Sequence, residues 1–188
     1  MSSEQKLLAI DTCTGSFSLA LFNGMDLLEC YVSPEANKQA ELLVPEIEAL
    51  LARHDLDYGD LDFFAANIGP GSFTGLRIGL SALKAWGLVL SAKAIAVTSL
   101  EAAAWAKGGG LITLDARRGQ AFQQKFDPSA HALSEPAMID YVGEFDLPAN
   151  AEAVGRMALW KLECGANLGE IRPLYIRDAD AKLPANRV

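Results

Sequence analysis

The chain has 188 residues, of which 51% are apolar, and its formal net charge is −8 at pH 7. This length fits one domain or two small lobes. No apolar run reaches the length of about 20 residues that a membrane span requires. The negative net charge opposes unaided binding to nucleic acid. Three cysteines without a CxxC pair, and a short polar start unlike a signal peptide, predict a reduced, cytoplasmic protein that binds no membrane.

The first half of the chain predicts an antiparallel meander followed by alternating helices and strands. Asn23-Gly24 is a strong hairpin turn between two apolar segments. Pro45 lies inside a helical pattern, where it either kinks the helix or marks its true start. In chain order we expect strands at 6–12, 16–22 and 25–32, a helix over 38–54, a connector at 55–62, a strand at 63–69, a helix from Gly75 to about Ser91, a strand at 94–99 and a helix at 100–106.

A glycine run at 108–110 is the best candidate for an internal boundary. It divides the chain into an N-terminal lobe, 1–107, and a smaller C-terminal lobe with a tail, 108–188. Beyond the run, LITLDA and QAFQQKFD flank the turn ARRG and predict a hairpin; the region 128–170 is less regular, with a helix expected at 152–163. Three strands before the first helix are not a Rossmann order. The order predicts an α/β protein with a mixed sheet of the ribonuclease-H-like pattern.

The segment GPGSFTGLRIG, residues 69–79, joins a strand to a long apolar helix, as phosphate-binding turns do. Its spacing matches neither the Walker A loop, which also needs a lysine, nor the dinucleotide fingerprint GxGxxG. Two interpretations stay open. Either backbone N–H groups at the start of the helix bind an anion, or the segment is a tight turn with Ser72 or Thr74 as the N-cap.

The helix after this segment is apolar or small on nearly every face, because its only charged residues are Arg77 and Lys84. Such a helix is either buried in a large core or shared with a partner. Gly75, Gly79 and Ala82 lie on one face, and each glycine costs about 1 kcal/mol relative to alanine. We interpret this face as a groove for a partner helix, with packing on the protein's own sheet as the alternative.

Several motifs resemble the bacterial TsaB (YeaZ) family, which is related to the glycoprotease-like TsaD superfamily. The glycine motif is preceded by an AIDT strand and followed by VTSLE, as in that family. LDARRGQAF at 114–122 and the tail RPLYIRDADAKLP at 172–184 are similar to it as well. The motifs keep the family's order along nearly the whole chain, and the match is weakest at 128–170.

The resemblance implies an actin/Hsp70-like ATPase fold of two ribonuclease-H-like lobes, the second one small. It also implies a non-catalytic role in making threonylcarbamoyladenosine beside the anticodon of tRNA. The implied partners are a metal-carrying, TsaD-like transferase and a small, TsaE-like ATPase. ATP and the metal are then expected in those subunits and not in this chain alone, and tRNA is contacted only through the complex.

We predict a partner-binding surface at the glycine motif and along the helix that it opens. A large exposed apolar patch is rarely tolerated, so we expect a homodimer through the same surface when the transferase is absent. The predicted partner-binding residues are Gly71, Ser72, Phe73, Thr74, Gly75, Arg77, Ile78, Gly79, Ala82 and Trp86.

Histidines and metal ligands give little support to catalysis. Catalytic relatives carry an H-x-x-x-H pair on the first helix, whereas the equivalent segment here, 36–43, has no histidine. His54 and His131 are isolated and expected to be solvated, and catalytic zinc takes three protein ligands. We therefore predict neither a catalytic residue nor a metal site.

Charged residues in three other segments have two interpretations each. Asp11 and Asp115 begin the hairpins that hold phosphates in ATP-binding members of the fold, and each is either a turn former or a metal ligand. Arg117 and Arg118 form either a solvated turn or a partner contact. In the tail, LYIR alternates as a strand does, and the cations at 177 and 182 are either a solvated edge or a contact with the partner or tRNA.

Two functions of different classes remain. The first is a non-catalytic scaffold that binds and activates a tRNA-modifying transferase. The second is a stand-alone enzyme of the same superfamily, either metallopeptidase-like or a small-molecule kinase. The missing histidine pair favours the scaffold. So do the phosphate hairpins, because Cys13 stands where the first would have a glycine and the second has two arginines in its turn.

Overall fold

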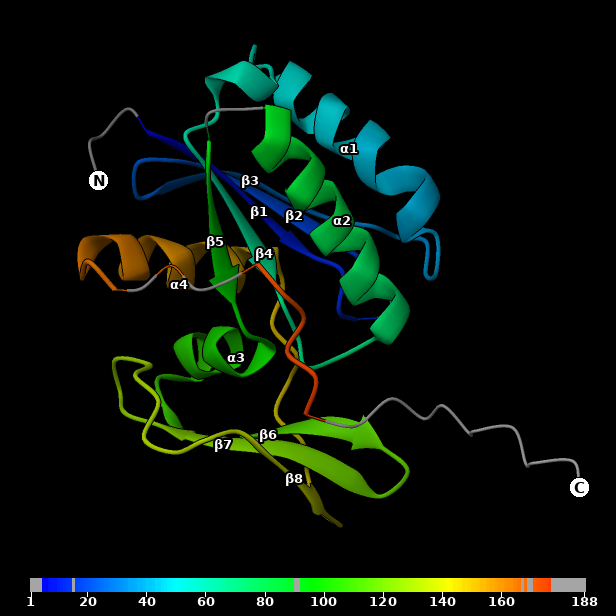
Figure 1. Cartoon of the computed structure of the whole chain (residues 1–188), viewed down its shortest axis with the longest axis vertical. Helices are drawn as coiled ribbons and strands as arrows, with labels where there is room; N and C mark the ends of the chain where they lie inside the picture. The colour runs from blue at the N-terminus through cyan, green and yellow to red at the C-terminus, as the bar shows by residue number, and fades with distance from the viewer. Residues whose placement is uncertain (1–4, 15, 90–91, 167, 169–170, 177–188) are drawn as a thin grey trace, which may run out of the picture.

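A five-stranded mixed sheet carries most of the fold (Figure 1). The computed structural model describes residues 5–14, 16–89, 92–166, 168 and 171–176. The strands of this sheet are β1 (Lys6–Asp11), β2 (Ser18–Asn23), β3 (Asp26–Val32), β4 (Phe63–Asn67) and β5 (Lys93–Val97). Their order is β3-β2-β1-β4-β5. β1 pairs antiparallel with β2 and parallel with β4, and β5 pairs parallel with β4.

The N-terminal strands form the predicted meander. Gly24 turns the β2–β3 hairpin with a φ of 58°, and its N–H donates to the Gln5 carbonyl at 2.8 Å. β1 and β4 are buried along almost their whole length. Because helices cover both faces of the sheet at these strands, their sequences are continuous apolar runs rather than alternating patterns.

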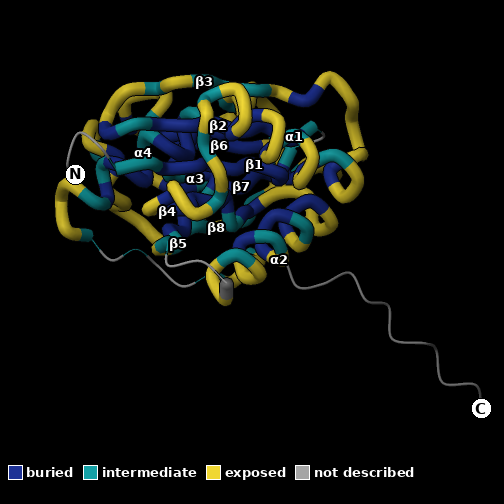
Figure 2. Tube along the Cα trace, turned by 90° about the horizontal axis from the view of Figure 1, so that it is seen from above, coloured by how far each residue is buried: buried dark blue, intermediate teal, exposed yellow. Residues whose placement is uncertain are grey.

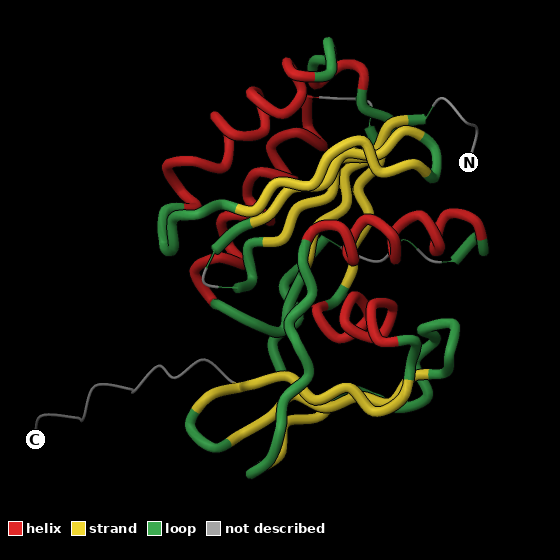
Figure 3. Tube along the Cα trace, turned by 180° about the vertical axis from the view of Figure 1, so that it is seen from behind, coloured by secondary structure: helices red, strands yellow, loops and turns green. Residues whose placement is uncertain are grey.

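Two helices lie side by side on one face of the sheet and a third lies on the other (Figures 1 and 3). α1 (Gln39–Arg53) and α2 (Phe73–Val89) form the first layer, and α4 (Ala151–Glu163) packs on the opposite face. α1 begins at Gln39 and continues through Pro45, so the proline does not mark the start of the helix. Between α1 and β4, the predicted connector contains a short 3-10 helix, η1 (Tyr58–Asp60).

A smaller antiparallel sheet packs beneath α3 (Ser99–Lys107), which separates it from α4 (Figure 3). Its strands are β6 (Gly110–Arg117), β7 (Gln120–Phe126) and β8 (Ala137–Asp140). The β6–β7 hairpin was predicted from the sequence, and β8 was not. Thr98 and Glu101 form a capping box at the start of α3, and Gly108 ends the helix with a φ of 82°. The left-handed conformation at Gly108 explains why a glycine run stands between α3 and β6.

The core does not divide at the predicted boundary between residues 107 and 108. α4 follows the second sheet in sequence, yet it packs on β1, β2 and β4 of the first. One apolar cluster joins the first sheet, α3, α4, β6 and β7. The two lobes therefore share one apolar cluster, and their assignment as separate domains stays a prediction. Within the described residues, no helix is both long and apolar enough to cross a membrane.

Candidate functional site

Polar side chains gather where the parallel strands of the first sheet end. Asp11 ends β1, and its Oδ1 accepts hydrogen bonds from the Cys13 backbone N–H at 2.8 Å and from Asn67 Nδ2 at 3.1 Å. Asn67 ends β4, and its Oδ1 accepts from the Gly69 N–H and from the Ser99 hydroxyl, each at 2.9 Å. The cluster thus ties the ends of β1 and β4 to the start of α3.

Among these polar side chains, Asp11 has the least complete hydrogen bonding. It is 1% exposed, and its Oδ2 has no hydrogen-bond partner in the structure. Burial raises the pKa of Asp11 to about 6, against the opposing effect of the hydrogen bonds from Cys13 and Asn67. A carboxylate without full hydrogen bonding is costly to bury. A strand-end aspartate was interpreted as a turn former or a metal ligand, and the side chain indeed holds the Cys13 turn.

The glycine loop closes over the end of β1. The Ser72 backbone N–H donates to the Cys13 carbonyl at 2.9 Å. A Cβ placed on Gly71 would lie 2.8 Å from that same carbonyl oxygen and 2.9 Å from Cys13 Cβ. The Ser72 hydroxyl accepts from the Gly75 N–H at 3.2 Å, as an N-cap does. The tight turn with Ser72 as N-cap therefore describes this segment, and α2 begins at Phe73, two positions earlier than predicted.

Gly75 and Gly79 pack on the protein's own sheet, which corrects our interpretation of an open glycine groove. A Cβ on Gly75 would collide with the Thr12 carbonyl oxygen, and one on Gly79 would lie 2.5 Å from Thr12 Oγ1. The Thr12 hydroxyl donates to the Gly75 carbonyl at 2.7 Å. The glycines let α2 approach the end of β1, so a partner helix has no access to them in this structure.

The outer face of α2 is exposed, and we call it the α2 stripe. Figure 2 shows buried and exposed residues alternating along the helix. Exposed residues recur at spacings of three or four, so they lie on one face. The residues of the stripe are Phe73, Arg77, Ser81, Lys84 and Leu88. The Arg77 guanidinium lies over the Phe73 ring, 3.9 Å from its centroid, as a cation–π contact.

The beginning of the C-terminal tail extends this surface. The Leu174 N–H donates to the Ile68 carbonyl at 2.8 Å, and the Tyr175 ring lies 5.4 Å from that of Phe73. Ile171 packs with Leu76 beneath α2. Two motifs that carry the resemblance, far apart in sequence, thus meet beside the α2 stripe. Residues 171–176 contain no strand, unlike the prediction, and the cations at 177 and 182 lie outside the described residues.

The predicted partner-binding residues divide into three groups. Gly71, Ser72, Phe73, Thr74 and Arg77 are exposed; Ile78, Ala82 and Trp86 are half-buried; Gly75 and Gly79 are buried.

Trp86 belongs to the protein's own core, since its ring stacks on Phe64 at 5.2 Å. Sequence analysis missed Ser81, Lys84 and Leu88 of the stripe, as well as Tyr175. The polar spacing of Arg77, Ser81 and Lys84 was the available signal for the outer face.

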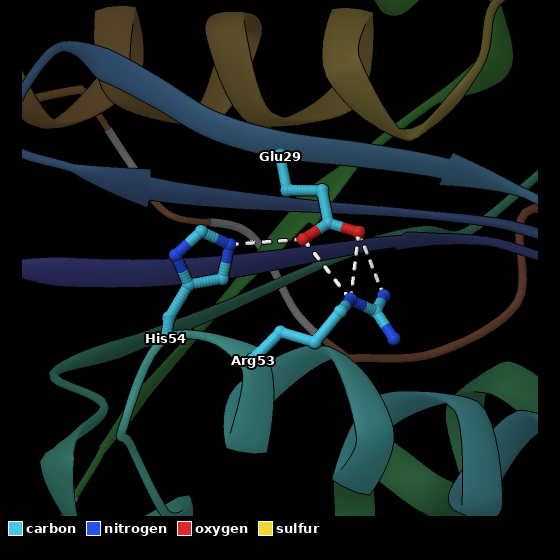
Figure 4. Close-up of polar contacts among 3 residues, drawn as sticks. All are labelled: Glu29, Arg53 and His54. Carbon is cyan, nitrogen blue, oxygen red and sulfur yellow. Dashed lines mark hydrogen bonds and ion pairs between the residues drawn. The ribbon is translucent and has the colours of Figure 1, made fainter.

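Both histidines have carboxylate partners, and only His54 departs from the predicted solvated position: it is half-buried, whereas His131 is exposed. His54 Nε2 lies 2.9 Å from Glu29 Oε2, and the same carboxylate accepts a hydrogen bond from Arg53 Nη2 at 2.7 Å (Figure 4). The bond from Arg53 lowers the pKa of Glu29. His131 Nδ1 lies 3.2 Å from Asp127 Oδ2. The contacts of Glu29 with Arg53 and His54 anchor the end of α1 to β3. No cluster of three residues that could ligate a metal occurs in the part of the chain that the structure describes.

The β6–β7 turn holds its two arginines in an unusual backbone conformation. Arg117 and Arg118 have φ values of 63° and 55°, and the Arg117 N–H donates to Asp115 Oδ1 at 2.6 Å. Asp115 thus acts as a turn former here. Both arginines are exposed, and their role as a partner contact stays a prediction.

These features define an α/β protein with a mixed sheet, in which residues 69–72 pack over the end of β1 and α2 presents an exposed face. The family described as TsaD, tRNA N6-adenosine threonylcarbamoyltransferase, matches residues 32–153. The chain belongs to this family and, within it, to the TsaB (YeaZ) group.

Relatives and solved structures agree with this assignment. An uncharacterized protein of Mycobacterium tuberculosis is 31% identical over 94% of this chain and 93% of its own. The tRNA threonylcarbamoyladenosine biosynthesis protein TsaB of Escherichia coli is 27% identical over 96% of this chain and 82% of its own. YeaZ from Pseudomonas aeruginosa shares the fold, with a TM-score of 0.77 and 19% identity over 91% of this chain and 99% of its own.

Proposed function

We propose that the chain is a non-catalytic subunit that binds and activates a TsaD-like transferase, which adds the threonylcarbamoyl group to adenosine in tRNA. The name of the Escherichia coli relative supports the pathway, and the matching family is named for the transferase itself. The modified adenosine lies beside the anticodon of tRNAs that read codons beginning with adenine. In this role the chain supplies an interface, and the partner supplies the chemistry.

The α2 stripe is the observation that carries the proposal. Phe73 is 44% exposed at one end of it and Leu88 is 88% exposed at the other. Between them, small Ser81 leaves room for a second helix to approach. Aromatic and arginine side chains dominate the binding energy of many interfaces, and Phe73, Tyr175 and Arg77 stack together here. This face suits a folded protein better than a small molecule.

The polar cluster of Asp11, Asn67 and Ser99 at the strand ends supports a binding role as well. ATP-binding members of the fold use this region for phosphates, whereas here the loop at 69–72 packs directly on Cys13 and Asp11 is buried beneath it. We therefore assign ATP and the metal to the transferase and to a TsaE-like ATPase. Because the net charge is −8, we assign tRNA contact to the complex rather than to this chain alone.

Co-expression with the transferase of the same organism tests the proposal. We expect the two proteins to co-purify, and we expect modified tRNA, measured by nucleoside mass spectrometry, only when both are present with the ATPase. The chain alone is expected to show no peptidase, ATPase or carbamoyl-transfer activity. Failure to co-purify, or turnover by the isolated chain, would contradict the proposal.

A further inference from the structure

The turn between β6 and β7 has two arginines where hairpins usually have glycine or asparagine. Arg117, Arg118 and Gly119 are consecutive residues with φ values of 63°, 55° and 75°. This left-handed conformation is unfavourable for residues with a Cβ, and two-residue hairpin turns therefore favour Asn-Gly or Gly-Gly. Both arginines are exposed, so burial of their side chains does not offset the cost. Residues that break a local rule in this way are expected at functional sites.

The carboxylates beside the turn are bonded to groups other than the guanidinium of Arg117. Asp115 Oδ1 accepts from the Arg117 backbone N–H at 2.6 Å, and Asp140 Oδ1 accepts from Gln120 Nε2 at 3.3 Å. Within the described residues, the guanidinium of Arg117 forms no ion pair. Its charge and its hydrogen-bond donors therefore face solvent.

The turn lies far from the most acidic part of the chain. Residues 26–62 contain ten acidic and two basic residues. They form β3, α1 and η1 in the first-sheet part of the molecule, whereas the β6–β7 hairpin lies at the opposite end (Figure 1). The second lobe has further carboxylates, of which Asp127 and Asp146 already accept hydrogen bonds from backbone N–H groups. A polyanion that approaches the hairpin thus avoids the repulsion from residues 26–62.

The chemistry of the turn suits phosphate groups better than a protein surface. A guanidinium donates two parallel hydrogen bonds to phosphate oxygens. Arginines that dominate protein interfaces lie in well-packed pockets from which water is excluded, whereas the apolar residues of this turn, Ala116 and Ala121, are buried in the chain's own lobe. The turn itself therefore offers charge and donors without an apolar surface, which is what contacts to a nucleic-acid backbone require.

We propose that Arg117 and Arg118 bind phosphate groups of the tRNA backbone when the chain is assembled with the transferase. The inference rests on the proposed function, which makes tRNA the substrate of the complex and assigns it no residue of this chain. The net charge of −8 opposes binding by the chain alone, so the transferase has to hold the tRNA in place. The two arginines then add affinity without reading sequence.

Neutral substitution of both arginines tests the contact. The Arg117→Gln/Arg118→Gln variant and the unaltered chain are each assembled with the transferase and the ATPase. Their affinity is measured for an unmodified transcript of a tRNA that reads codons beginning with adenine. Each lost phosphate contact lowers the slope of log affinity against log salt by about 0.7 to 0.9. We therefore expect the slope to fall by about 1.5, and binding at about 0.1 M salt to be about tenfold weaker or more.

Two further variants separate charge from the geometry of the turn. Arg117→Lys/Arg118→Lys keeps both charges and should retain most of the salt slope. Lys93→Gln removes one exposed cation from β5 in the first sheet, and its complex should bind the tRNA as tightly as that of the unaltered chain. Circular dichroism of each isolated variant verifies that it is folded.

Three results would overturn the inference and leave the proposed function intact. The first is an unchanged tRNA affinity and salt slope in the Arg117→Gln/Arg118→Gln complex, which would mean a solvated turn. The second is loss of co-purification with the transferase in that variant, because the arginines would then contact a protein. The third is a lysine variant that binds tRNA as weakly as the glutamine variant. Failure of the unaltered chain to co-purify would instead contradict the proposed function, and the inference with it.

Discussion

Gly75→Ala is expected to destabilise the protein by about 3 kcal/mol, at the upper end of the usual cost of overpacking. The new methyl group would collide with the Thr12 carbonyl oxygen. That carbonyl belongs to the backbone at the end of β1, and the Thr12 hydroxyl is bonded to Gly75 in turn at 2.7 Å. Neither segment can yield without loosening the contact between α2 and the sheet.

The matched control is Gly87→Ala on the same helix. A Cβ at Gly87 meets nothing within 4 Å, so this substitution should instead stabilise the protein by up to about 1 kcal/mol through helix propensity. Chemical unfolding of both variants measures the difference. Equal stability of the two variants would mean that α2 does not rest on Thr12.

Asp11→Asn is expected to raise the free energy of unfolding by up to about 3 kcal/mol at neutral pH. The pKa of Asp11 is about 6 in the folded protein against 3.8 for the ordinary side chain, and a tenfold change in a proton-binding constant corresponds to about 1.4 kcal/mol. A raised carboxyl pKa means that the folded state binds the proton more tightly. Stability contributed by this group is therefore present below about pH 4 and lost as the pH rises through about 6.

Asparagine removes this pH dependence, because it stays neutral and keeps an oxygen to accept from Cys13 and Asn67. Urea unfolding between pH 4 and pH 8 should show the variant and the unaltered chain converging at the acid end, separating between about pH 4 and pH 6, and differing by a constant amount above that. Glu163→Gln is the control, since it removes one exposed carboxylate of the same charge. A constant difference across the whole pH range would refute the raised pKa.

The elements of the first sheet were predictable because local signals and long-range packing agree there. Asn23-Gly24 fits its hairpin turn, Thr98 and Glu101 form their capping box, and the helical spacing in α1 matches its buried face. The β8 strand gave no such signal. It is short, its two end residues are exposed, and it pairs with β7. Its sequence therefore carries little local information that would predict a strand.

The sequence predicted that the partner-binding surface lies on α2, but it did not predict which face of α2 is exposed. Periodicity placed Gly75 and Gly79 on one face of α2, but it does not say which face meets the sheet. That choice depends on Thr12, which is distant in sequence and contacts α2 because β1 pairs with β4, the strand that precedes α2. In the same way, Tyr175 joins Phe73 only through the bond between Leu174 and Ile68.

The affinity of a Ser81→Trp variant for the TsaD-like transferase tests the central claim most directly. Ser81 is exposed in the middle of the α2 stripe, so a bulky side chain there blocks helix approach without disturbing the protein's own core. Overpacking of about 1–3 kcal/mol predicts binding about ten- to a hundredfold weaker than that of the unaltered chain, at unchanged stability. Lys125→Trp, at an exposed position on β7, should bind normally. Equal affinity of the Ser81→Trp variant and the unaltered chain would place the interface elsewhere.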